Sequence, residues 1–277
     1  MTKRVISVFL CVLCVISSIS FIVSAKENKE YTSDNFLSVA DGIIAWKKAD
    51  NGSEPDGYLI NDKYLENAGT TPGDWYPIAL GRLGIQDNNE GYLAVIKDRV
   101  EERYRESGRL SAAKATEWHR IALAVLAMGG DPTNFGTDEN GAPINLIADG
   151  TYDRGKTTPL GRQGINGWIW GLITLDSMRY AVPDGAYNTR DDIIVEIISK
   201  QLSDGGFALS SDDADPDITA MAITALAPYY NSEKIITEKR CPPMRAKRCT
   251  RLLMKRFCAF HVCNSTRATT KVGELRM

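Results

Sequence analysis

Four segments of the chain align with one another without gaps, and this internal repeat constrains the fold more than any other feature. The segments are DWYPIALGRLG (Asp74 to Gly84), EWHRIALAVLA (Glu117 to Ala127), NGWIWGLITLD (Asn166 to Asp176) and DITAMAITALA (Asp217 to Ala227). Their starting residues lie 43, 49 and 51 positions apart. Self-similarity at this period indicates supersecondary units that bury their apolar faces by stacking on their neighbours.

Three columns carry the match: a small residue at the fifth position after each start, and large aliphatic residues at the sixth and ninth. They are Ala79, Ala122, Gly171 and Ala222; Leu80, Leu123, Leu172 and Ile223; and Leu83, Leu126, Leu175 and Leu226. These offsets differ by three and four, so they lie on one helical face. Each segment is therefore predicted to be one packed helix. Its acidic or Asn start suits a helix N-terminus, and Asp215-Pro216 places a capping residue before a first-turn proline.

Other helices are predicted between these segments, at residues 36–48, 91–106 and 191–201. The third copy lacks a strong partner, because residues 144–147 are short and a Gly- and Thr-rich stretch follows them. The sequence thus predicts an all-α fold of helix-pair repeats, each of roughly 45 residues. Such arrays stack as an open superhelix or close into a ring, and the period alone does not choose between them.

The net charge of −2 averages two unlike parts of the chain. Residues 239–277 contain 11 Lys and Arg against the single acid Glu274, so residues 1–238 have a net charge of −12. Binding of nucleic acid by this acidic body is not expected, because nothing there would neutralise phosphates.

Residues 26–238 contain no cysteine, so this part folds without disulfides or thiol ligands. The remaining cysteines lie in the N-terminal apolar run and in the basic tail. Those of the tail, with His261, form no Cys-x-x-Cys pair, which is the usual chelating unit. Neither a metal site nor a cofactor is predicted.

The N-terminus indicates export. Lys3 and Arg4 precede an apolar stretch from Val5 to Val23, and Val23 and Ala25 are placed for cleavage after Ala25. We expect residues 1–25 to be a signal peptide and the protein to be secreted or at the cell surface. An uncleaved membrane anchor is the alternative, because Val5 to Ala25 is nearly long enough to span a bilayer.

The segment QLSDGGF (Gln201 to Phe207), followed by DPDITA (Asp215 to Ala220), resembles the repeat of the terpene cyclase and protein prenyltransferase superfamily. In that repeat a Gln, a Gly and an aromatic residue recur between the outer and inner helices of an α/α toroid. Residues 35–230 as a whole resemble secreted bacterial prenyltransferase/squalene-oxidase repeat proteins. The resemblance implies a partial α/α toroid at residues 26–230, with about four helix pairs. It says little about function, because this toroid hosts cyclases, transferases and carriers.

The resemblance gives weak grounds for catalysis. Squalene-type cyclases protonate their substrate from an Asp-x-Asp-Asp-Thr-Ala motif, which Asp213, Asp215 and Asp217 approach, but Pro216 and Ile218 break the spacing. Helix capping is the competing role for these acids. The zinc site of protein prenyltransferases needs Asp, Cys and His. It is not expected here, because the body has no Cys and only one His, His119.

The stronger site candidates are aromatic and polar residues near the starts of the inner helices. In the toroid family these helix starts surround the mouth of a central cavity. The candidate ligand-binding residues are Trp75, Tyr76, Trp118, His119, Arg120, Trp168 and Trp170. Such a cluster suits a flat, apolar or saccharide ligand. The alternative is that these side chains are core residues that wedge neighbouring helices apart.

The repeat pattern stops after Tyr230. Residues 231–277 are interpreted as a basic tail, and a displaced reading frame is one explanation for it. Codons permitted from Asn264 onward, read two bases along, can spell QLDEGDYKSWGTEN, which restores Gln-x-x-x-Gly-x-Tyr where a fifth repeat is due. The chain would then be truncated relative to its family. The alternative is a genuine basic tail that binds an anionic cell-wall polymer or a lipid surface.

These observations favour a secreted or cell-envelope binding module for an apolar, aromatic or glycan-like ligand, which it holds without turning over. One alternative is a terpene cyclase-like enzyme that uses Asp213, Asp215 and Asp217. Another is a repeat scaffold that binds a protein through its outer face. The sequence does not specify an oligomeric state.

Overall fold

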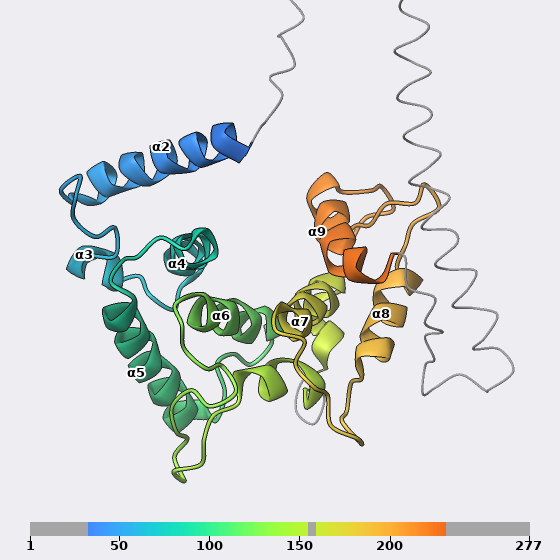
Figure 1. Cartoon of the computed structure of the whole chain (residues 1–277). Helices are drawn as coiled ribbons and strands as arrows, with labels where there is room; N and C mark the ends of the chain where they lie inside the picture. Colours follow the sequence, from blue (N-terminus) through green and yellow to red (C-terminus); the bar gives the residue numbers. More distant parts are fainter. Residues whose placement is uncertain (1–32, 155–158, 231–277) are drawn as a thin grey trace, which may run out of the picture. The chain divides into compact units, whose positions relative to one another are not determined.

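The computed structural model describes residues 33–154 and 159–230, and within these ranges the fold is all-α, as predicted (Figure 1). The chain divides into two compact units, Met1–Gly57 and Tyr58–Met277. The signal peptide predicted at residues 1–25 and the tail at 231–277 lie outside the described residues. The α-helices are α2 (Ser33–Asn51), α3 (Asp62–Leu65), α4 (Thr71–Leu83), α5 (Asn89–Ser107), α6 (Ala115–Ala127), α7 (Ile165–Ser177), α8 (Arg190–Ser199) and α9 (Pro216–Leu226).

The described part of the first unit is α2 and the turn that follows it. This helix covers the one predicted at residues 36–48, and its large apolar side chains Phe36, Val39, Ile43 and Trp46 are exposed. Among the described helices, α2 included, none is both long and apolar enough to cross a membrane.

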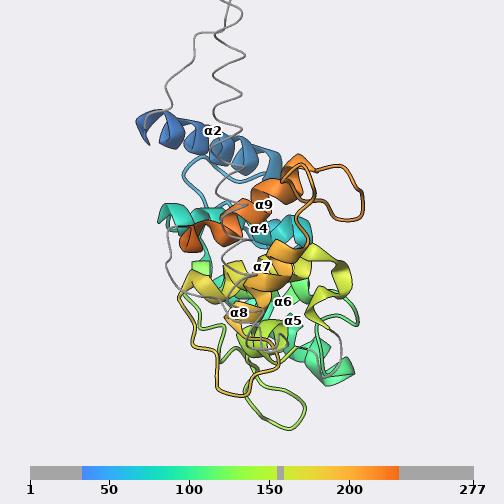
Figure 2. The ribbon, with the colours of Figure 1, turned by 90° about the vertical axis from the view of Figure 1, so that its right-hand side faces the viewer.

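The second unit contains the four repeated helices α4, α6, α7 and α9. Each packs against the next along the chain, α4 on α6, α6 on α7 and α7 on α9 (Figures 1 and 2). Helices α5 and α8 correspond to the segments predicted at residues 91–106 and 191–201, and α8 packs on α7. In this unit α5 therefore precedes α6 and α8 precedes α9 in the predicted order, whereas α2, the helix predicted before α4, belongs to the other unit.

Burial follows the fifth-position column in three of the four copies, whereas half of the aliphatic residues at the sixth and ninth positions are only partly buried. At the fifth position Ala122, Gly171 and Ala222 are buried, whereas Ala79 of the first copy is exposed. The small residue is buried where a preceding inner helix stands beside it, and α4 is the first inner helix of the row. Close approach between neighbours is clearest at Gly81, where an added Cβ would lie 2.0 Å from the carbonyl oxygen of Ala127 at the end of α6. Only glycine permits this α4–α6 spacing.

The third copy lacks a regular outer helix, as predicted. After α6 the chain is irregular as far as Ile147, then forms a single π-helical turn at Ala148–Tyr152 and a 3-10 turn at Leu160–Gln163. Ile144, Leu146 and Ile147 are nevertheless buried. An irregular segment therefore takes the place that a helix has in the other pairs.

The Gln-x-x-x-Gly-x-Phe segment shapes the turn between α8 and α9. The amide of Gln201 donates to the carbonyl of Gly205 at 2.8 Å, and Gly205 has a φ of 89°, which favours glycine. Phe207 is buried, and its N–H donates to the hydroxyl of Thr219 in the first turn of α9. The motif thus stabilises the turn by a hydrogen bond, buries its aromatic ring in the core and connects the turn to α9 by a second hydrogen bond.

Candidate functional site

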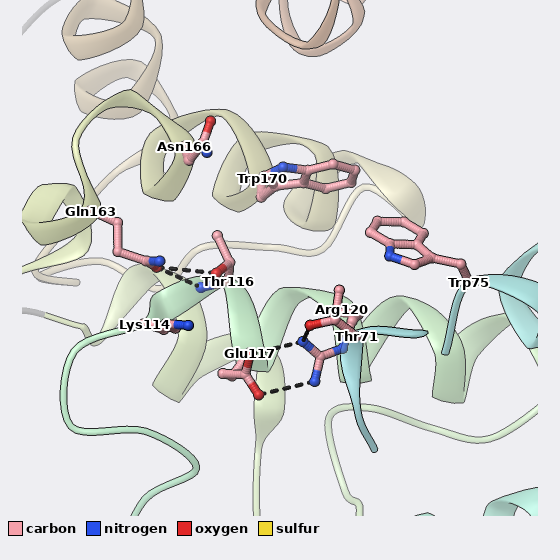
Figure 3. Close-up of a pocket in the computed structure, with 9 residues that line it drawn as sticks. All are labelled: Thr71, Trp75, Lys114, Thr116, Glu117, Arg120, Gln163, Asn166 and Trp170. Atoms are coloured by element: carbon pink, nitrogen blue, oxygen red, sulfur yellow. Dashed lines mark hydrogen bonds and ion pairs between the residues drawn. The ribbon is translucent and has the colours of Figure 1, made fainter. Parts of the chain in front are cut away.

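The N-terminal ends of α4, α6 and α7 converge on a cavity of about 210 Å³ (Figure 3). Its position follows from the repeat, because equivalent positions of successive copies line it. Thr71, Lys114 and Gln163 each stand three residues before a repeat start, and Glu117 and Asn166 are themselves starts. The other lining residues are Trp75, Thr116, Arg120 and Trp170.

Two tryptophans form the aromatic side of the cavity. The ring centroids of Trp75 on α4 and Trp170 on α7 lie 5.5 Å apart, with an interplanar angle of 54°. Trp75 is 42% exposed, a large fraction for an apolar side chain of this size. Of the seven candidate ligand-binding residues, these two tryptophans and Arg120 line the cavity, and the indoles leave ring surface open to it.

Arg120 lies on the opposite side and is fully engaged by the protein. Its guanidinium forms a two-pronged pair with Glu117, at 2.8 and 2.9 Å, and its Nε donates to Asp74 at 2.8 Å. The remaining N–H groups donate to the hydroxyl of Thr71 and the carbonyl of Gly69. All five donors of the arginine are therefore used. Arg120 supports the cavity and has no free donor for a ligand.

Asp74 anchors this network from below, and the sequence argument missed that role. It was expected at the start of its helix, but α4 begins at Thr71 and Asp74 is completely buried. Its carboxylate accepts hydrogen bonds from the N–H of Gly69 and the hydroxyl of Tyr92, both at 2.7 Å, besides that from Arg120. Burial raises the pKa of Asp74, and the hydrogen bonds from Arg120 and Tyr92 oppose this effect. The available signal was its column, which also supplies Glu117 and Asn166.

Glu117 carries the carboxylate nearest to the cavity. Burial acts to raise its pKa, but the hydrogen bonds and charge of Arg120, with the charges of Arg103 and Lys114, outweigh burial and lower it. Arg103 approaches the carboxylate at 3.6 Å. Glu117 is therefore ionised at neutral pH and held by its cations.

Gln163 closes the cavity at the start of α6, another role that the sequence argument missed. Its side-chain oxygen accepts from the backbone N–H of Thr116 at 3.4 Å and from the Thr116 hydroxyl at 3.1 Å. The N-cap residue of α6, Lys114, forms no side-chain cap of its own. A residue from the segment before α7 thus caps the preceding inner helix.

Trp118 and His119 do not reach the cavity, in contrast to the expectation that they gather at its mouth. Trp118 is 3% exposed, donates from its indole to the hydroxyl of Tyr104 at 2.8 Å, and packs under the guanidinium of Arg154. His119 is fully buried, and its Nε2 donates to the carbonyl of Gly150 at 2.9 Å. Both residues point away because α6 turns their side chains toward α5 and the irregular segment of the third copy.

Burial also determines the protonation of His119. It lowers the pKa to about 3, so the ring is neutral at ordinary pH. A neutral, solvent-excluded imidazole cannot exchange protons with a ligand in the cavity. His119 is a core residue of the repeat.

Tyr76 and Trp168 are partly buried and also absent from the cavity lining. Tyr76 packs edge-on against Tyr64, with ring centroids 6.4 Å apart. The ring of Trp168 lies over Gly161, where an added Cβ would be 2.3 Å from the indole nitrogen. These two residues wedge neighbouring segments, the alternative role considered for the aromatic cluster.

The three acids of the cyclase alternative lie elsewhere. Asp213, Asp215 and Asp217 are exposed at the start of α9, and none lines the cavity. The carboxylate of Asp215 accepts from the N–H groups of Asp217 and Ile218, at 2.8 and 2.9 Å, with Pro216 in the first turn. The predicted cap is confirmed. Within residues 33–154 and 159–230, no group of three or more His, Cys, Asp or Glu side chains could hold a metal ion.

Comparison of the chain with protein-family models, with curated proteins and with solved structures finds no match in any of the three. The candidate site therefore depends on the geometry of this chain alone.

Proposed function

We propose that the chain is a binding module that holds a small apolar, aromatic or glycan-like ligand in the cavity between α4, α6 and α7 without turning it over. The observation that carries this proposal is the pair of indoles, Trp75 and Trp170, on one side of a cavity whose other lining is polar. Rings of ligands bind to such surfaces by stacking, while the polar groups orient them.

The state of the ionisable groups supports binding without chemistry. General acid–base catalysis needs a group that can give or take a proton next to the ligand. Both oxygens of Glu117 are bound by Arg120, all the donors of Arg120 are occupied, and His119 is buried outside the cavity. Glu117 and Arg120 therefore serve to maintain the shape of the cavity.

The proposal also includes the fold family and the cellular location of the protein. The order of the inner helices supports the resemblance to α/α-toroid repeat proteins, in which helix starts gather around a cavity. The signal peptide that the sequence predicts at residues 1–25 supports a location in the cell envelope or outside the cell. We infer that the ligand is met there.

The test is to titrate the full chain with a neutral sugar, an aromatic alcohol and an isoprenoid alcohol. Binding is monitored by tryptophan fluorescence and by calorimetry. One class should bind, and Trp75→Ala should weaken that binding about ten-fold, since loss of aromatic stacking costs about 1 kcal/mol or more. Trp46→Ala is the matched control, because Trp46 is an exposed tryptophan of the other unit. Equal affinity of wild type and Trp75→Ala would refute the site.

A further inference from the structure

Among the groups that line the cavity, more of the hydrogen-bond acceptors than of the donors are already paired within the protein. Most acceptors are engaged: the oxygen of Gln163 accepts from Thr116, and the carboxylate of Glu117 and the hydroxyl oxygen of Thr71 accept from Arg120. The exception is the side-chain oxygen of Asn166, which accepts from no described residue. A ligand that enters the cavity therefore finds few acceptors to which it could donate.

Donors, in contrast, remain. The ammonium of Lys114 forms no ion pair with a described residue. The amide nitrogens of Gln163 and Asn166, and the indole N–H groups of Trp75 and Trp170, donate to no group in the described part of the chain. Unpaired donors therefore outnumber the one unpaired amide oxygen, that of Asn166, and this excess favours a ligand rich in acceptor oxygens.

The charges around the cavity also favour a ligand with acceptor oxygens, because they favour an anion. Around the cavity stand the cations of Lys114, Arg103 and Arg120 and the carboxylates of Glu117 and Asp74. Three cations thus face two carboxylates, which leaves one positive charge in excess. Lys114 acts on Glu117 through its charge but, unlike the two arginines, forms no ion pair with a described residue. This is notable because residues 1–238 have a net charge of −12. The cavity is a locally positive place on an acidic body.

The lining also divides in space. Figure 3 shows Gln163 and Lys114 on one side of the cavity and Trp75 on the other, with the Glu117–Arg120 pair below. The volume of about 210 Å³ is smaller than the ~300–1,000 Å³ typical of sites for drug-sized ligands, so it suits one ring with a substituent.

We propose that the ligand is a single ring that bears a carboxylate, with the ring on Trp75 and Trp170 and the carboxylate at the Lys114 and Gln163 side. This inference rests on the proposed binding function and names its ligand class. Two sources share this chemistry, a hexuronic acid and an aromatic acid. Charge-assisted hydrogen bonds from an ammonium and an amide would hold the carboxylate in either case.

The experiment is calorimetric titration of the full chain at low salt with two matched pairs, glucuronate against glucose and benzoate against benzyl alcohol. We expect the acid of one pair to bind about ten-fold more tightly than its neutral partner, and the pair that does so identifies the source. Lys114→Met should remove this preference while leaving the neutral compound unaffected. Lys114→Arg should retain it, and Lys97→Met, which changes an exposed lysine of α5, should behave as wild type.

The outcomes separate the two proposals. If neutral and acidic partners bind equally, or if Lys114→Met keeps the preference, the carboxylate assignment is overturned while the binding function stands. If none of the four compounds binds, both are overturned for these ring classes. Added salt should weaken binding of the acid alone, because screening acts on the Lys114 contact. A circular dichroism spectrum of each variant shows that its helices are intact.

Discussion

Replacement of His119 by glutamine should reduce the sensitivity of the fold to mild acid. The ring is fully buried, and its Nε2 donates to the carbonyl of Gly150. Glutamine can place an amide nitrogen where Nε2 lies, so His119→Gln keeps the hydrogen bond and removes the titrating group. The Nδ1 atom accepts no hydrogen bond from a described residue, so the change sacrifices no second contact.

The magnitude follows from the pKa. Burial lowers the pKa of His119 to about 3, whereas an unfolded histidine has a pKa of about 6.5. Between these values the unfolded chain binds a proton that the folded chain does not, so stability falls as the pH falls. At about pH 5, which is about 1.5 pH units below the unfolded pKa, protonation of the unfolded state lowers the free energy of unfolding by about 2 kcal/mol relative to neutral pH. Above the unfolded pKa the ring is neutral in both states and this contribution to stability is fully present; the loss is complete only below the folded pKa.

The assay is urea unfolding at about pH 8 and about pH 5, followed by circular dichroism. Wild type should lose about 2 kcal/mol more than His119→Gln between the two conditions, and carboxylates contribute equally to both proteins. His261→Gln separates the contribution of the second of the two histidines in the chain. Equal losses for wild type and His119→Gln would show that the folded protein protonates His119, and the burial argument would be refuted.

Three further substitutions test the packing of the repeats by urea unfolding. Arg120→Met should destabilise the fold by roughly 3–5 kcal/mol, because it leaves the fully buried carboxylate of Asp74 without its cation; a loss below about 1 kcal/mol would contradict this. Gly81→Ala should cost roughly 1–3 kcal/mol, because its Cβ would lie 2.0 Å from a carbonyl oxygen of α6, and wild-type stability would show that the two helices are farther apart. Gln201→Ala should cost about 1 kcal/mol, because it removes the hydrogen bond to Gly205; no loss would mean that the glycine alone fixes the turn.

The inner helices could be predicted because their information is local. A small residue followed by aliphatic residues one and four positions later marks a helical face within each single copy, and Ala122 and Leu175 are buried members of such faces. The cap at Asp215 was predictable for the same reason, since its partners follow it directly. The absence of a regular outer helix in the third copy was visible in its Gly- and Thr-rich composition.

The cavity was only partly predictable, because its groups are assembled across repeats. Arg120 and Asp74 are 46 residues apart, and Gln163 and Thr116 are 47 apart. Trp75 and Trp118 occupy the same repeat position, yet one is exposed at the cavity and the other is buried. What differs is the neighbour, because α5 and Arg154 cover Trp118. Equivalent positions in a repeat therefore do not share an environment where the outer elements differ.

The cap that Gln163 provides for α6 has a consequence for how this architecture can change. The oxygen that satisfies the start of α6 comes from the following repeat, and Arg120 of α6 binds the carbonyl of Gly69 in the preceding one. A single repeat thus does not contain all the hydrogen-bond partners of its own polar groups. Removing or exchanging one whole repeat would leave polar groups of both neighbouring repeats without their hydrogen-bond partners. Such a change would have to bring its own partner for the start of α6 and for the carbonyl of Gly69.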